Sequence, residues 1–175
     1  WVNSKAIELA GITNDTPNPQ GGYIYRDKNG EATGVFTDTA MYPISGIIPA
    51  KTDEQIRRSY EECAAMLPSY GFTSIMDAGT SPKNIELYKQ LIKEGVWKTR
   101  VDAEVSVNSM ESEGMKYVLN NEPKMGLLNN MLDVMCIKMF ADGSMGGRSA
   151  AMLEEYSDAP GKMGEYIYKD DELNE

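Results

Sequence analysis

The chain has 175 residues, of which 41% are hydrophobic and 25% are charged, and its formal net charge is −10. This length and composition exclude a disordered or fibrous protein and are typical of a single compact core. Because the positive charges are scattered among acidic neighbours, neither nucleic acid nor an anionic membrane is expected as a partner. No apolar run approaches the length of a membrane-spanning helix.

Cysteine usage and the two ends of the chain bear on its context. Cys63 and Cys136 fall in an expected helix and an expected strand, so we expect buried, reduced thiols and a cytoplasmic location. The chain begins with Trp1 instead of Met, and residues 170–172 are acidic, as in the first turn of a new helix. We therefore expect this chain to be a piece of a longer protein.

The first fifty residues differ from the rest of the chain in their sequence pattern. Residues 3–10 are typical of a capped helix. Two β-prone runs, 23–26 and 33–36, flank the turn sequence Asp-Lys-Asn-Gly at 27–30. Asn-Gly between such runs favours a hairpin, because both residues tolerate the positive φ of a tight turn. We expect residues 1–51 to form a small helix and β-hairpin insert outside the main core.

From residue 52 onward, helical and strand patterns alternate. The expected order is a helix capped by Thr52 or Asp53 and ended before Gly71, a strand at 72–77, a helix at 84–94, a strand at 99–107, helical or partly helical segments at 109–120 and 124–132, and a strand at 133–140. Alternation with such short connections predicts βαβ units and a parallel sheet over residues 52–175. An α+β domain with mixed strands is the alternative.

The expected strands carry polar residues where ligands bind in parallel α/β folds, at the carboxyl ends. The first strand ends at Asp77. The second places Asp102, Glu104 and Ser106 on one face and only small apolar residues on the other. In the third strand, alternation predicts a common face for four residues, namely Val134, Cys136, Lys138 and Phe140. Lys138 is therefore expected to project into the same interior as Glu104.

Lys138 stands inside an apolar strand, just before the polar loop Asp142-Gly143-Ser144. A lysine in such a place is costly to bury and easily perturbed, so it suggests a chemical role. A salt bridge from Lys138 to Glu104, Asp77 or Asp142 is the alternative, and the loop has the alternative of an ordinary turn. The chain has no histidine, which removes most partners for acid-base chemistry.

Three segments together resemble a known family. They are the sequences WVNSKAIELAGI at 1–12, YGFTSIMDAG at 70–79 and IKMFADGS at 137–144. Their order and spacing resemble the YtcJ-like branch of the metal-dependent amidohydrolases, the branch that includes N-substituted formamide deformylase. The resemblance extends over essentially the whole chain.

The resemblance implies a metal-containing (β/α)8 TIM barrel that hydrolyses amide-type C–N bonds of a small molecule through a metal-activated water. The fold class expected here is α/β: a partial TIM barrel with parallel strands, corresponding to strands two to four, plus the N-terminal hairpin insert. Lys138 then matches the carboxylated lysine that bridges two divalent metals, zinc being the expected one. Asp142, Gly143, Ser144 and Asp77 are the expected substrate-binding residues.

The chain also departs from the family pattern, because it contains no histidine. The histidine ligands of the family lie on strands that this chain would not contain, so alone it is expected to bind no catalytic metal and to be inactive. Two other functions stay open. Lys138 could form a Schiff base with a carbonyl substrate. Alternatively, the chain could be a binding or assembly module that forms a homo-oligomer through exposed sheet edges.

Overall fold

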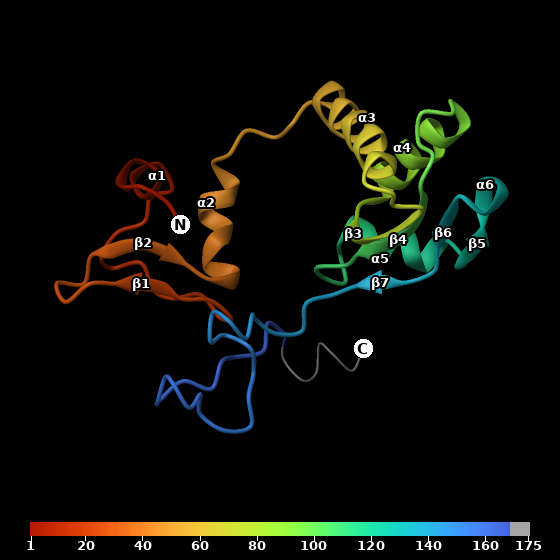
Figure 1. Ribbon diagram of the computed structural model, residues 1–175. Helices are drawn as coiled ribbons and strands as arrows, with labels where there is room; N and C mark the ends of the chain where they lie inside the picture. Colours follow the sequence, from red (N-terminus) through yellow and green to blue (C-terminus); the bar gives the residue numbers. More distant parts are fainter. Residues whose placement is uncertain (169–175) are drawn as a thin grey trace. The chain divides into compact units, whose positions relative to one another are not determined.

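The computed structural model describes residues 1–168, which form two compact units (Figure 1). Unit 1 comprises Trp1–Ala50 together with the described residues from Phe140 onward, and unit 2 is Lys51–Met139. The sequence interpretation placed the whole of 52–175 in one domain, whereas residues 140–168 group with the first fifty. The helix start expected at 170–172 lies outside the described residues.

Unit 1 contains short elements only. They are α1 (Ser4–Leu9), β1 (Ile24–Arg26), β2 (Ala32–Phe36), the 3-10 helix η1 (Asp38–Met41) and α2 (Tyr42–Gly46). The side chain of Asn3 caps α1 by accepting from the Ala6 backbone N–H at 3.0 Å. β1 and β2 pair antiparallel and form a sheet of their own. A small apolar core of Ile12, Ile24, Phe36, Ala40 and Ile44 holds these elements together.

The turn between β1 and β2 is built by one aspartate. The Oδ1 of Asp27 accepts from the backbone N–H groups of Asn29 and Glu31, each at 2.9 Å. These bonds satisfy donors that the turn leaves unpaired and lower the pKa of the Asp27 carboxyl below its ordinary value. Gly30 has φ +83°, the conformation that Asn-Gly turns need.

Three helices of unit 2 follow strong local signals. They are α3 (Asp53–Ser69), α4 (Pro82–Lys93) and α5 (Glu113–Asn120). Thr52 starts α3 with a capping box, in which its Oγ1 accepts from the Gln55 N–H at 3.2 Å and the Gln55 side chain accepts from the Thr52 N–H at 2.9 Å. Ser81 and Ser112 cap α4 and α5 through one bond each, in which the serine side chain accepts from a backbone N–H of the first turn. None of the helices within residues 1–168 combines the length and apolar character needed to cross a bilayer.

The sheet of unit 2 has the order β3-β4-β6-β5, with β7 also paired to β4. Its strands are β3 (Ser74–Thr80), β4 (Arg100–Ser106), β5 (Lys124–Gly126), β6 (Leu132–Val134) and β7 (Ile137–Lys138). β3, β6 and β7 run parallel to β4, as the alternating pattern predicted, whereas β5 runs antiparallel to β6. α3, α4 and α5 contribute to one core with β4 and β6.

Two expectations for residues 124–140 are corrected. Residues 124–132 are not a regular helix: β5 is followed by α6 (Leu127–Asn130), in which Leu128 and Asn129 have left-handed backbone angles. The 133–140 strand is in fact two short strands, because the chain leaves the sheet between β6 and β7. Both cysteines are free, but Cys136 lies in this interruption and is exposed, so the expectation of a buried thiol is wrong there.

Candidate active site

The two faces of the unit 2 sheet differ sharply in polarity. Val101, Ala103 and Val105 of β4 are each at most 2% exposed and belong to the core shared with the helices, and Val107 just after the strand is fully buried. We call this the helix-covered face. The alternate residues of β4 point to the other side, and residues paired in parallel register share a face. The polar face is therefore made by Asp102, Glu104, Ser106, Asp133 and Lys138.

One extra residue places Lys138 on the polar face. The register pairs are Val101 with Leu132, and Val105 with Ile137. Four steps along β4 thus correspond to five along β6 and β7, which is the signature of a bulge. Val134 is 7% exposed on the helix-covered face, while Lys138 pairs with Ser106 on the polar face. The expected common face for Val134 and Lys138 is wrong. Without the extra residue Lys138 would point toward the helices, because a one-residue slip reverses the facing of every side chain.

Lys138 extends past β4 to the carboxyl end of β3. A Cβ atom added at Gly79 would lie 3.7 Å from the Lys138 Cγ, so the lysine stem passes directly over this glycine. Gly79 has φ +127°, and the β3–β4 register shifts there, between Ala78 and Thr80. Gly79 is not among the residues predicted for the site, although a glycine inside a strand pattern is a known signal of such a bulge.

Asp77 lies on the opposite face from Lys138. It pairs in register with Ala103, so its side chain belongs to the helix-covered face. The hydroxyl of Tyr88 on α4 donates to the Asp77 Oδ2 at 2.9 Å. This bond connects β3 to α4 within the core of unit 2, which is a structural contact. A substrate-binding role for Asp77 stays a prediction.

Asp77 borders a cluster of three aromatic rings, Tyr60, Tyr88 and Trp97. The ring of Tyr88 meets Tyr60 edge-on at a centroid distance of 5.0 Å and Trp97 at 4.8 Å. Burial raises the pKa of Tyr88 far above its ordinary value of 10.0, and the negative charge of Asp77 adds to the effect. Burial likewise raises the pKa of the Cys63 thiol, with a further contribution from Asp77. At neutral pH both groups are therefore uncharged, and the Tyr88 hydroxyl serves as a hydrogen-bond donor to Asp77.

The predicted loop Asp142-Gly143-Ser144 belongs to unit 1 and is closed by its own hydrogen bonds. The Asp142 Oδ2 accepts from the Ala151 N–H at 3.0 Å, and the Ser149 Oγ accepts from the Ser144 N–H at 3.0 Å. A Cβ atom added at Gly143 would lie 2.4 Å from the Ser149 Oγ, so only glycine fits. Ser149, which is 4% exposed, organises this loop, and no sequence signal pointed to it.

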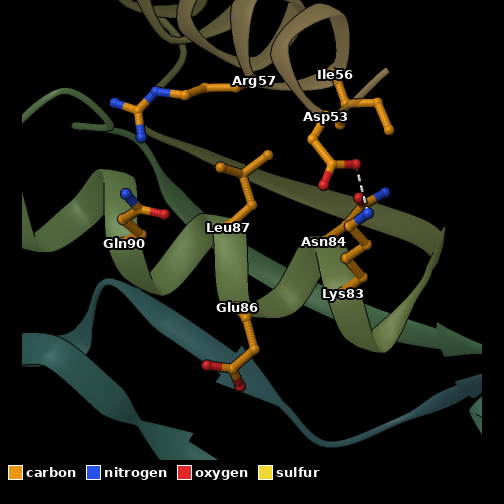
Figure 2. Close-up of a pocket in the computed structure, with 8 residues that line it drawn as sticks. All are labelled: Asp53, Ile56, Arg57, Lys83, Asn84, Glu86, Leu87 and Gln90. Carbon is orange, nitrogen blue, oxygen red and sulfur yellow. Dashed lines mark hydrogen bonds and ion pairs between the residues drawn. The ribbon is translucent and has the colours of Figure 1, made fainter. Parts of the chain in front are cut away.

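A separate groove of about 330 Å³ runs between α3 and α4 (Figure 2). It is lined by Asp53, Ile56, Arg57, Lys83, Asn84, Glu86, Leu87 and Gln90. Its cationic groups are already paired: Lys83 with Asp53, and Arg57 with Glu94 at 2.6 Å. None of the predicted site residues lines it, so this groove is a feature of the helical layer and not part of the candidate site.

The residues present do not complete the metal site that the resemblance implies. The chain has no histidine, and residues 1–168 contain no group of three or more cysteine, aspartate or glutamate side chains placed to hold a metal ion. Catalytic zinc sites use three protein ligands rich in nitrogen. A metal-ligand role for Lys138, as a carbamate, stays a prediction.

Comparison with known proteins gives matches to one family, two of which extend over essentially the whole chain. The model of the amidohydrolase family matches residues 1–175. YtcJ of Bacillus subtilis is 28% identical over 177 aligned residues, which cover 98% of this chain and 32% of that protein. N-substituted formamide deformylase of Arthrobacter pascens is 31% identical over 97 residues, covering 51% of this chain and 17% of the enzyme.

The solved structures agree with these sequence matches. An uncharacterized metal-dependent hydrolase from Pyrococcus furiosus superimposes with a TM-score of 0.63 at 27% identity, over 98% of this chain and 33% of that one. The chain thus spans about a third of the length of YtcJ and of this hydrolase. Because the family model covers every residue, the chain belongs to the amidohydrolase family.

Proposed function

We propose that this chain works as one part of a metal-dependent hydrolase that cleaves amide-type C–N bonds of a small molecule. Membership in the amidohydrolase family supports the reaction class. The similarity to N-substituted formamide deformylase and to the metal-dependent hydrolase of P. furiosus supports the bond type and the use of a divalent metal. Zinc is the metal proposed.

The placement of Lys138 carries the proposal. Lys138 ends β7 on the polar face, and its stem lies over Gly79 at the end of β3. The carboxyl ends of parallel strands are where α/β folds place their reacting groups. We propose that Lys138 is carboxylated in the intact enzyme and bridges the metals there, with histidine ligands supplied from outside this chain.

We further propose that Asp142, Gly143 and Ser144 shape the mouth of the site, and that the isolated chain is inactive. An ion pair between Lys138 and Glu104 in the metal-free chain stays a prediction. A cytoplasmic location is supported by the two free cysteines.

The decisive experiment replaces Lys138 by alanine in a full-length protein that contains this chain. We expect loss of bound metal, measured by elemental mass spectrometry, together with loss of amide hydrolysis. Short carboxylic acids added to Lys138→Ala should restore part of both, because they replace the carbamate oxygens. Lys124→Ala is the matched control, since Lys124 is exposed on β5.

Two results would contradict the proposal. One is a Lys138→Ala protein that keeps its metal and its activity. The other is covalent trapping of a carbonyl substrate on Lys138 by borohydride, which would establish Schiff-base chemistry instead. In the isolated chain, carbon NMR with labelled bicarbonate should show no carbamate, because no metal charge is present to stabilise that anion.

Assembly through a sheet edge is a second candidate function, favoured by the position of β3. This strand ends the sheet order, and Phe72 and Met76 are 53% and 62% exposed. Edge strands left open in this way pair with other chains. Light scattering should show oligomers that Met76→Lys reduces to monomers. A monomeric parent chain would exclude this candidate.

A further inference from the structure

Residues 162–167 of unit 1, which we call the connector, lie against the start of the β1–β2 hairpin region. Both carboxylate oxygens of Glu165 accept hydrogen bonds there. Its Oε2 accepts from the Gly21 backbone N–H at 3.3 Å, and its Oε1 accepts from the Tyr23 hydroxyl at 3.3 Å. These residues are separated by more than 140 positions in the sequence, so one side chain joins two distant segments of the chain.

A second side chain of the connector strengthens the same contact. The Lys162 Nζ lies 4.9 Å from the centre of the Tyr25 ring on β1 and 3.4 Å from its hydroxyl oxygen. It also lies 5.9 Å from the centre of the Tyr23 ring. An ammonium over aromatic faces is attracted by their negative potential. The connector is thus bound to the hairpin by one anionic and one cationic group.

The backbone of the connector contacts the loop that follows Lys138. The Glu165 N–H donates to the Ser149 carbonyl at 3.3 Å, and the Ile167 N–H donates to the Ala141 carbonyl at 2.9 Å. The approach is close, because a Cβ atom added at Gly164 would lie 2.0 Å from the Ala150 carbonyl oxygen. Gly164 therefore cannot be replaced without separating the connector from this loop.

Hydrogen bonds within the loop connect residues 149–151 to the predicted mouth residues 142–144. Ser149 accepts from the Ser144 N–H, and the Ala151 N–H donates to Asp142. A displacement of residues 149–151 must therefore displace residues 142–144. The contacts form one continuous series from the hairpin through the connector to the loop.

We infer that Glu165 is a positioning residue, through which the β1–β2 hairpin holds the loop 141–151 in place. The functional value of this arrangement rests on the proposed function, because it is that proposal which assigns residues 142–144 to the mouth of the site. The hairpin region is then more than an appended element. It supports the segment that directly follows the lysine strand.

The test compares Glu165→Ala with Glu165→Gln in the 175-residue chain by hydrogen exchange. Alanine should speed exchange of the amides in 141–151 by about tenfold, the effect of losing a charge-assisted hydrogen bond. Glutamine should restore protection, because its amide oxygen still accepts from Gly21 and its amide group can pair with the Tyr23 oxygen. Glu154→Ala is the matched control, because Glu154 is exposed in the same region.

The exchange of α4 in unit 2 separates positioning from general loss of structure, since α4 should keep its protection in every variant. The inference is overturned if Glu165→Ala leaves 141–151 fully protected, if glutamine fails to restore protection, or if α4 loosens equally. Should Glu165→Ala not fold, Tyr23→Phe removes one of the two bonds and should give a smaller acceleration in 141–151. No arm requires metal or turnover, so failure of the hydrolase proposal would leave this result unaffected.

Discussion

The hydrogen bond from Tyr88 to Asp77 allows a sharp test of how β3 is held. Tyr88→Phe removes one oxygen atom from a side chain that is 4% exposed, while the ring contacts to Tyr60 and Trp97 remain available. The change therefore removes the hydrogen bonds of the Tyr88 hydroxyl, chiefly the 2.9 Å bond to Asp77 together with its contact to Tyr60, and leaves the packing of the rings in place. Asp77→Asn changes the other partner of the same bond.

A hydrogen bond to a charged group contributes about 1.5–3 kcal/mol, so Tyr88→Phe should lower the free energy of unfolding by that amount. In a unit of this size each 1 kcal/mol lowers Tm by about 4–8 °C. The double variant Tyr88→Phe with Asp77→Asn should lose less stability than the sum of the two single losses. The difference, which is the coupling energy, should be about 1 kcal/mol or more.

Urea denaturation followed by tryptophan fluorescence is a suitable assay, because Trp97 contacts the Tyr88 ring. Tyr70→Phe is the matched control, since Tyr70 is 75% exposed in the same unit and its change should alter stability by less than about 0.5 kcal/mol. Additive effects of the Tyr88 and Asp77 changes would refute the reasoning, because they would show that the two groups do not depend on one another.

The same bond predicts a pH dependence. Burial and the charge of Asp77 raise the pKa of Tyr88 above 10.0, so the folded state favours the neutral phenol. The contribution of Tyr88 is fully present below pH 10 and is lost as the pH rises above that value, because the unfolded phenol ionises first. Stability measured from neutral pH upward should fall beyond pH 10, and Tyr88→Phe should reduce this fall.

Three further changes test the core, the helix packing and one ion pair. Leu91→Ala should lower the free energy of unfolding by about 2–5 kcal/mol in urea denaturation, because Leu91 is fully buried. Gly114→Ala should cost about 1–3 kcal/mol by the same assay, since its Cβ would lie 1.9 Å from the Ser106 carbonyl oxygen. Arg148→Gln should raise the pKa of the Asp158 carboxyl, measured by NMR titration, because the Arg148 hydrogen bond holds that pKa below its ordinary value of 3.8.

Leu91→Ala has a matched control, and each of the three changes has a result that would contradict it. Leu119→Ala, at a position 73% exposed, should change stability little, and equal effects at Leu91 and Leu119 would contradict the described core. A Gly114→Ala protein as stable as the parent would show that α5 does not approach β4 so closely. An unchanged titration of Asp158 in Arg148→Gln would show that the pair is absent in solution.

The sequence alone determined the elements that depend on neighbouring residues. The helix start at Thr52 or Asp53, of which Thr52 is the cap, and the Asn-Gly turn at 29–30 follow from local hydrogen-bonding and backbone preferences. The alternation in β4 correctly separated the buried residues from Asp102, Glu104 and Ser106, because a strand of regular pleat needs only its own sequence to define two faces. The family resemblance, carried by three segments in order, was also confirmed.

Tertiary contacts determined the features that a regular alternation of polar and apolar residues does not reveal. The extra residue between β6 and β7 reversed the facing of Lys138 relative to Val134, and the register with β4, not the local sequence, reveals it. The register with Ala103 turns Asp77 toward the helices, where Tyr88 donates a hydrogen bond to it. Residues 124–126 became a strand through pairing with β6. Residues 140–168 group with the first fifty residues, and Glu165 and Lys162 contact the hairpin there. Such long-range side-chain pairs leave no periodic signal in the sequence.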